Sequence, residues 1–123
     1  MAGVHSFEDL RVWQEARTLT REIYAVTGGA GLARDYGLVS QLRRSAVSVM
    51  ANIAEGFSRG RPREFSQYLS IARASCAELR SHLYVALDTH QLRQEDFFRL
   101  LRAALGISRM LTALKLAVTR KGV

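Results

Sequence analysis

The stretch PREFSQYLSIARASCAELRSHLYVALD, residues 62–88, decides the fold class. Its apolar residues follow one another at spacings of four and three, which places them on one face of an α-helix. Pro62 suits the first position of this helix, because the N–H that proline lacks would have no intrahelical partner there. We therefore predict a helix over residues 62–88 with a single apolar seam. The seam consists of Phe65, Leu69, Ala72, Cys76, Leu79, Leu83 and Ala86.

The same apolar period recurs before and after this helix, and glycine-rich or polar stretches separate the periodic segments. The first segment opens at Ser6, a favourable N-cap, and ends at the glycines that begin with Gly28. Helices with one apolar face, joined by short loops, bury those faces only when they pack around a shared axis. We predict an all-α fold, an antiparallel up-down-up-down four-helix bundle that forms a single domain over residues 1–123. The predicted helices span residues 7–27, 36–57, 62–88 and 94–120.

Composition narrows the class of protein. The 123 residues include 18 Lys and Arg against 11 Asp and Glu, a net charge of +7, and Cys76 is the single cysteine. A lone cysteine excludes an intramolecular disulfide and the zinc sites that need several thiolates. The longest stretch without a charged residue, 23–33, is far shorter than the roughly 20 residues of a membrane span. Because the first residues also lack the basic start of a signal peptide, we expect a cytoplasmic protein without a membrane partner.

Arginine carries the positive charge, and most of the excess lies in residues 34–61 and 89–123. The apolar seam of a helix over 94–120 consists of Phe97, Leu101, Ala104, Ser108, Leu111 and Val118, and the arginines of this helix gather in one sector opposite that seam. Clustered guanidinium groups neutralise nucleic-acid phosphates and bind them through paired hydrogen bonds. Alternatively they form an ordinary solvated face that reflects codon bias, since the chain has 16 Arg and 2 Lys. The candidate contacts to RNA or DNA are Arg43, Arg44, Arg59, Arg61, Arg63, Arg99, Arg102, Arg109 and Arg120.

A second set of apolar residues lies off the seams of the first and fourth predicted helices. One bundle core cannot take both sets, and exposed apolar patches usually mark protein interfaces. We therefore predict a homo-oligomer built through these two helices. Alternatively, a tilted bundle axis lets wide apolar stripes serve a single core. The predicted interface residues are Leu10, Trp13, Tyr24, Phe98, Leu105 and Leu116.

A line of polar residues runs beside the apolar seam of the second predicted helix. Small hydroxyl and amide side chains allow helices to approach closely and fix their register through hydrogen bonds. We favour this structural role over a binding groove, with Ser75 and Glu78 of the next helix as candidate partners. The polar line consists of Gln41, Ser45, Ser48, Asn52 and Glu55.

The sequence lacks the motifs of the common catalytic and metal sites. No Glu is followed three positions later by His, the spacing that a di-metal bundle requires. Glu78 and His82 share a helix face, but a single pair of this kind is usually a surface hydrogen bond. Cys76 falls on an apolar seam, where a thiol is usually inert. We predict no enzymatic activity, no cofactor and no metal.

The run QLRRSAVSVMANIAEG, residues 41–56, strongly resembles the signature of the bacterial four-helix-bundle proteins encoded in intervening sequences of large-subunit ribosomal RNA genes. Residues 7–13 resemble the opening Phe-x-x-Leu-x-Val-Trp of the same family. The resemblance covers residues 7–87, and the fourth helix matches only by pattern. The third helix carries it through Glu64, Phe65, Leu69, Ala72, Ser75, Glu78 and Leu79.

This resemblance implies a four-helix protomer that assembles into a ring-like homo-oligomer, with a pentamer as the expected size. The related accessory variability-determinant proteins of diversity-generating retroelements form a basic barrel that is linked to nucleic acid and to a reverse transcriptase. The family pattern also implies a structural role for Asn52, Glu55 and Gly56. We predict a non-enzymatic homo-oligomer that binds RNA or DNA without sequence preference. The alternative is an interaction scaffold that docks an acidic protein such as a polymerase or reverse transcriptase.

Overall fold

The computed structural model describes residues 2–121, which form four α-helices preceded by one turn of 3-10 helix. Within these residues there is no strand, so the predicted all-α class is confirmed. Three of the helices keep their predicted boundaries to within one residue. The elements are η1 (Phe7–Asp9), α1 (Arg11–Thr27), α2 (Tyr36–Ser58), α3 (Pro62–Asp88) and α4 (Gln94–Lys121).

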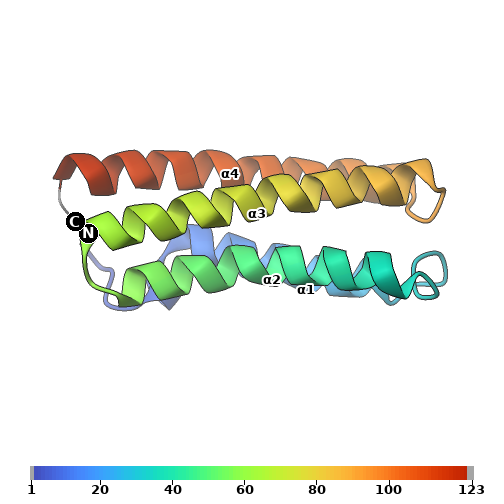
Figure 1. Cartoon of the computed structure of the whole chain (residues 1–123), viewed down its shortest axis with the longest axis horizontal. Coiled ribbons are helices and arrows are strands. Elements are labelled where there is room, and N and C mark those ends of the chain that lie inside the picture. The colour runs from blue at the N-terminus through green and yellow to red at the C-terminus, as the bar shows by residue number, and fades with distance from the viewer. Residues whose placement is uncertain (1, 122–123) are drawn as a thin grey trace.

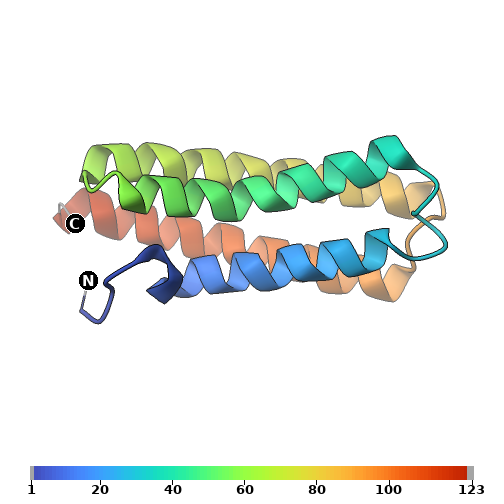
Figure 2. The same ribbon diagram turned by 90° about the horizontal axis from the view of Figure 1, so that it is seen from below.

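Consecutive helices run in opposite directions, as Figure 1 and Figure 2 show. Contacts between early and late positions fix this arrangement. The hydroxyl groups of Ser66 near the start of α3 and Thr119 near the end of α4 lie 3.5 Å apart, and Tyr84 near the end of α3 packs edge-on against Phe97 near the start of α4. The helices therefore form a four-helix bundle in which each helix packs against the one before it in the chain.

One hydrophobic cluster draws side chains from all four helices. The predicted seam of α3 is buried in full, from Phe65 to Ala86. Each large apolar side chain removed from water stabilises the fold by roughly 1.5–3 kcal/mol, so a shared core compensates for the entropy lost when four long helices become ordered. No helix in the described part of the chain is long and apolar enough for a membrane span.

The start of α1 differs from the prediction. The Asp9 carboxylate accepts a hydrogen bond from the Ser6 backbone N–H at 3.1 Å, and this short loop favours a 3-10 turn over a regular helix. The backbone at Leu10 is extended, with φ −74° and ψ 123°, so α1 begins at Arg11. Ser6 therefore caps η1 and not the first long helix.

The buried face of α4 overlaps the predicted seam only in part. Four predicted residues, Phe97, Ala104, Leu111 and Val118, are buried. Leu100 and Ile107 are buried, whereas the predicted Leu101 and Ser108 are half-buried. This shift is toward the side of α4 that carries Arg99, which pairs with Glu22 of α1. Adjacent apolar residues make both seams possible, and contact with α1 as well as α3 selects between them.

Candidate nucleic-acid interface

Helix α4 presents a row of unpaired arginines. Arg102, Arg109 and Arg120 are exposed, and their spacings of 7 and 11 residues keep them within about 20° of one another around the helix. No carboxylate follows Asp96 in α4. Among residues 2–121, none of the three arginines has an ion-pair partner. Their guanidinium groups are therefore available to bind phosphate.

Arg99, which was predicted to share this surface, is already paired with carboxylates. Its guanidinium forms an ion pair with Glu22 of α1, and its Nη2 lies 3.0 Å from Oδ1 of Asp96. These contacts tie α4 to α1 and neutralise the Arg99 charge. Arg99 is thus a weaker candidate for phosphate binding than the row of unpaired arginines.

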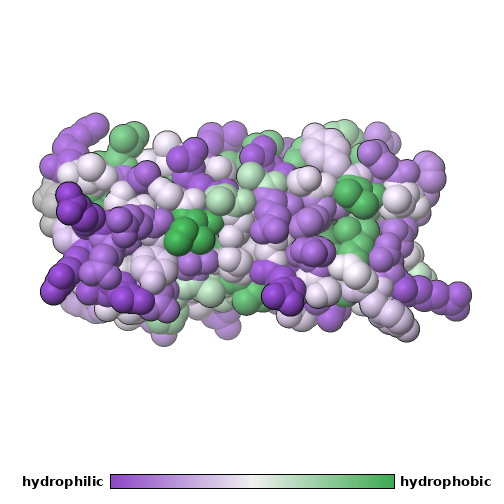
Figure 3. Space-filling model, viewed as in Figure 1, coloured by the Kyte–Doolittle hydropathy of each residue, from purple (hydrophilic) through white to green (hydrophobic). Residues whose placement is uncertain are grey.

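The connection between α2 and α3 is strongly hydrophilic, as Figure 3 shows at the end of the bundle where α2 turns into α3. Arg59 Nε lies 3.1 Å from the Glu55 carboxylate, and Arg59 Nη2 donates to the Tyr68 hydroxyl at 2.9 Å. Tyr68 and then Glu55 raise the pKa of Arg59 above its usual value. Arg61 lies 3.9 Å from Glu64. Arg63 is exposed and has no carboxylate partner within the described residues.

The two adjacent arginines of α2 have different surroundings. Arg43 Nε donates to the Thr27 hydroxyl at 2.9 Å, and its guanidinium lies 4.4 Å from the centre of the Tyr24 ring. Arg43 therefore joins α2 to α1. Arg44 is exposed and borders a polar hollow of about 540 Å³ between α2 and α3, which Glu78 also lines.

Two arginines of α3 that sequence reasoning missed face α4. Ser66 and Tyr84 of α3 both contact α4, and Arg73 and Arg80 lie between them on the same helix edge because 66, 73 and 80 differ by seven. Arg73 is exposed, and the buried Nε of Arg80 has no hydrogen-bond partner among the described residues. Sequence reasoning missed these two arginines because α3 has no net charge. Their seven-residue spacing could have identified them.

The polar line of α2 meets α3 at its centre. Ser48 contacts Ser75, and Asn52 Nδ2 donates to the Ser48 carbonyl oxygen at 2.8 Å and to its hydroxyl at 3.0 Å. The hydroxyl of Ser45 is bonded to the backbone of its own helix. These small side chains hold α2 close to α3. The ends of the line, Gln41 and Glu55, are exposed.

Two predicted interface residues at the start of α1 pack against the protomer itself. Leu10 is 4% exposed and belongs to the core, so the expectation that it lies off the core is wrong. The extended backbone at this position, which follows the η1 turn, directs Leu10 inward. Trp13 is half-buried and packs edge-on against Phe7, with ring centres 5.1 Å apart.

The other predicted interface residues divide between two sides of the bundle. Tyr24 lies at the groove between α1 and α2, where the Arg43 guanidinium covers its ring. Phe98 contacts Phe97, which in turn contacts Tyr84 of α3. The structure therefore does not bring the predicted set together into one patch. Leu105 and Leu116 follow Phe98 by 7 and 18 residues and share its side of α4.

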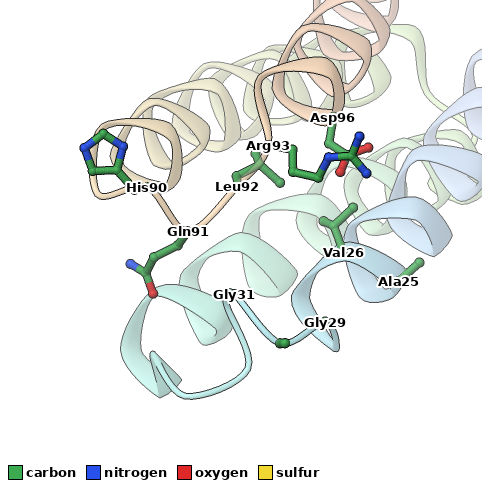
Figure 4. A pocket seen from close by; sticks show the side chains of 10 residues that line it. Ala25, Val26, Gly29, Gly31, His90, Gln91, Leu92, Arg93 and Asp96 are labelled. Carbon is green, nitrogen blue, oxygen red and sulfur yellow. The ribbon is translucent and has the colours of Figure 1, made fainter.

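A pocket of about 630 Å³ lies at the loop end of the bundle, between the end of α1 and the start of α4. Arg93 and Asp96 lie on one side of it, and Gly31 and Gln91 lie on another, as Figure 4 shows. A Cβ at Gly31 would sit 2.6 Å from the Gln91 carbonyl oxygen, so glycine lets the two loops touch. We interpret the pocket as a consequence of this loop packing.

The reactive side chains do not assemble into a metal or nucleophile site. Across residues 2–121, no three His, Cys, Asp or Glu are placed to hold a metal ion. Glu78 Oε2 and His82 Nε2 are 3.9 Å apart on one helix. Burial raises the pKa of the Cys76 thiol to about 11, which keeps it protonated and unreactive at neutral pH.

Comparison with known proteins identifies the family. Residues 8–113 match the model of the 23S rRNA-intervening sequence protein family. The fold is similar to the crystal structure of a protein of unknown function from the S23 ribosomal protein family of Bacteroides thetaiotaomicron, with a TM-score of 0.77 and 20% identity over 85% of this chain and 97% of that chain. No curated protein matches the chain. Because the matched residues run from η1 into α4, the chain belongs to the 23S rRNA-intervening sequence protein family.

Proposed function

We propose that this protein is a non-enzymatic nucleic-acid-binding protein that contacts phosphates without sequence preference. The observation that carries the proposal is the row of Arg102, Arg109 and Arg120, which are exposed on a helix segment without carboxylates. Arg73 and Arg80 add positive charge on the neighbouring edge of α3. Guanidinium groups on two neighbouring helices suit a polyanion, because each bound phosphate releases condensed counterions.

Salt dependence tests this proposal directly. Fluorescence anisotropy with a labelled RNA of about 20 nucleotides, measured from about 50 to 200 mM salt, should show log affinity falling linearly with log salt concentration. The expected slope is roughly −0.7 for each phosphate neutralised on a single strand. Binding that is undetectable at the lowest salt, or unchanged across the range, contradicts the proposal.

Charge reversal locates the surface. Arg102→Glu with Arg109→Glu should weaken binding to unrelated sequences by similar factors and make the salt slope shallower. Arg11→Glu with Arg21→Glu is the matched control, because it makes the same change in net charge at exposed positions of α1. Equal losses in both double variants would assign the binding to net charge and not to the α4 row.

We also propose that copies of the chain associate, with the pentamer implied by the family resemblance as the expected size. Tyr24 and Val47 are large apolar side chains that remain exposed, and they border a hollow of about 380 Å³ over the groove between α1 and α2. Exposed apolar patches of this kind usually mark interfaces. Arg43 and Arg44 also line this hollow, so the interface would combine apolar and basic side chains. We assign self-association to this side because its exposed apolar side chains adjoin a hollow that a second copy can fill.

An acidic protein is the second candidate partner for the α4 surface. Phe98 and Leu116 are exposed beside the arginine row, so the surface could accept apolar as well as acidic side chains. Binding of an isolated acidic polymerase or reverse transcriptase that persists after nuclease treatment, and that Arg102→Glu with Arg109→Glu abolishes, would favour this candidate.

A further inference from the structure

We infer that the bound nucleic acid is single-stranded and that its bases stack on Tyr84 and Phe98. This inference rests on the proposed function and specifies the class of nucleic acid. The helices α3 and α4 touch along a line that runs from Ser66 and Thr119 to Tyr84 and Phe97, and we call the surface along this line the α3–α4 groove. The two rings lie at one end of it. Tyr84 is 50% exposed and Phe98 is 45% exposed, although both belong to long helices.

The two rings are held in place by a third, buried ring. Tyr84 packs edge-on against Phe97 with ring centres 4.9 Å apart, and Phe98 packs against Phe97 at 5.3 Å. Phe97 is itself 2% exposed and belongs to the core. The exposed rings are therefore supported from below, so little conformational entropy is lost when a base stacks on them.

These rings differ from the aromatic residues on the opposite side of the bundle. There, the guanidinium groups of Arg17 and Arg43 lie over Trp13 and Tyr24, at 5.8 and 4.4 Å from the ring centres. No guanidinium in the described structure covers Tyr84 or Phe98 in this way. Their faces remain free for another π system.

The arginines follow the rings in matched order along the groove. Arg80 precedes Tyr84 by one helical turn on α3, and Arg102 follows Phe98 by one turn on α4. Because α3 and α4 are antiparallel, both arginines lie on the same side of the ring pair along the bundle. Two turns further on, the pattern continues with Arg73 and Arg109.

This order of rings and cations fits one strand with accessible bases. Proteins that bind single strands without sequence preference combine a positively charged groove for the backbone with aromatic side chains on which bases stack. In a duplex the bases are stacked inside the helix, and side chains reach phosphates but not base faces. The groove offers its rings and arginines side by side, so a single strand can use both.

The test compares the affinity of the protein for single strands with its affinity for a duplex. It uses a variant in which the two exposed rings are replaced by apolar side chains that are not aromatic. Labelled oligouridylate and oligothymidylate of about 20 nucleotides, and a duplex of equal phosphate count, are titrated with the full chain. Tyr84→Leu with Phe98→Leu keeps apolar cover over Phe97. We expect this double variant to lose roughly tenfold or more in affinity for the single strands and less than about twofold for the duplex. Tyr36→Leu, which removes an 80% exposed ring from α2, is the matched control and should change neither affinity.

A reporter ring gives a second readout. In Phe98→Trp, a single strand that stacks should quench the added tryptophan fluorescence, whereas the duplex should not. Unchanged single-strand affinity in the double leucine variant, or equal wild-type affinity for duplex and single strand, overturns the stacking inference while leaving phosphate binding intact. Absence of binding to every probe overturns the proposed function itself. A difference between the uridylate and thymidylate arms shows which single strand the groove prefers.

Discussion

At the scale of single residues, Asp35 links two loops at one end of the bundle. Its Oδ1 accepts the backbone N–H of Leu38 at 3.1 Å, which caps α2, and its Oδ2 accepts Gln91 Nε2 at 2.9 Å from the loop before α4. The hydrogen bond from Gln91, followed by that from Leu38, lowers the pKa of Asp35 below its ordinary value. One carboxylate therefore stabilises a helix start and a contact between loops.

Replacing Asp35 should destabilise the fold. We expect Asp35→Ala to lower the free energy of unfolding in urea, because the cap of α2 is lost. Asp35→Asn keeps an oxygen acceptor for Leu38 and should cost less. Since the folded-state pKa is lowered, the Asp35 contribution is present above the unfolded pKa near 3.8 and disappears as pH falls through the folded pKa. Equal stability of Asp35→Ala and wild type would contradict this role.

The buried thiol of Cys76 should make the fold less stable at alkaline pH. The ordinary pKa of the thiol is 9.0, and burial raises it to about 11, although Arg80 partly opposes the shift. Between these values the unfolded chain loses the proton while the folded chain keeps it, so unfolding becomes easier as pH rises. The stability advantage of wild type over Cys76→Ala should shrink by about 2 kcal/mol from pH 9 to 11. Parallel pH profiles of the two proteins would contradict the prediction.

At the scale of helices, the sequence predicts a buried face well where only one face is apolar. The seam of α3 is such a case, and all of its predicted residues are buried. In α4, Leu100 and Leu101 are adjacent, so contacts with α1 and α3 decide which of them enters the core. No periodicity within one helix contains that information.

The same limit applies to the candidate site. The exposed positions of Arg102 and Arg109 follow from the period of α4 and could be predicted. The pairing of Arg99 with Glu22 could not, because these residues are 77 positions apart and meet only when α1 packs against α4. The sequence therefore predicts which helix is basic. Only the packing of the helices shows which of its arginines are paired with carboxylates.

Gly56 tests how closely α2 must approach α3. A Cβ at this position would lie 2.5 Å from the Tyr68 Cβ and 3.1 Å from the Phe65 ring. We expect Gly56→Ala to lower the free energy of unfolding by about 1–3 kcal/mol through overpacking, despite the higher helix propensity of alanine. Gly106→Ala in α4 is the matched control, because its Cβ would meet nothing within 4 Å. That change should raise stability by up to about 1 kcal/mol, and a similar gain for Gly56→Ala would refute the close-packing argument.

At the scale of the whole molecule, the proposed assembly depends on the groove between α1 and α2. Trp13 is a poor site for testing this contact, because it packs on Phe7 and its replacement would also disturb the protomer. Val47 is 40% exposed at the hollow beside Tyr24, so a charge there should leave the core unchanged. Self-association through this hollow would bury Val47 and make it sensitive to a charged substitution.

Light scattering of wild type should therefore give a multiple of the 13.8 kDa protomer mass, and Val47→Arg should shift the mass toward 13.8 kDa while the helical circular dichroism is retained. The shift is expected because an unpaired guanidinium buried between copies loses its hydration without gaining a partner. Thr18→Arg adds the same charge at an exposed position of α1 and should leave the assembly intact. A wild-type mass of one protomer would contradict the proposed assembly. An unchanged mass for Val47→Arg would show that the copies do not associate through the groove between α1 and α2.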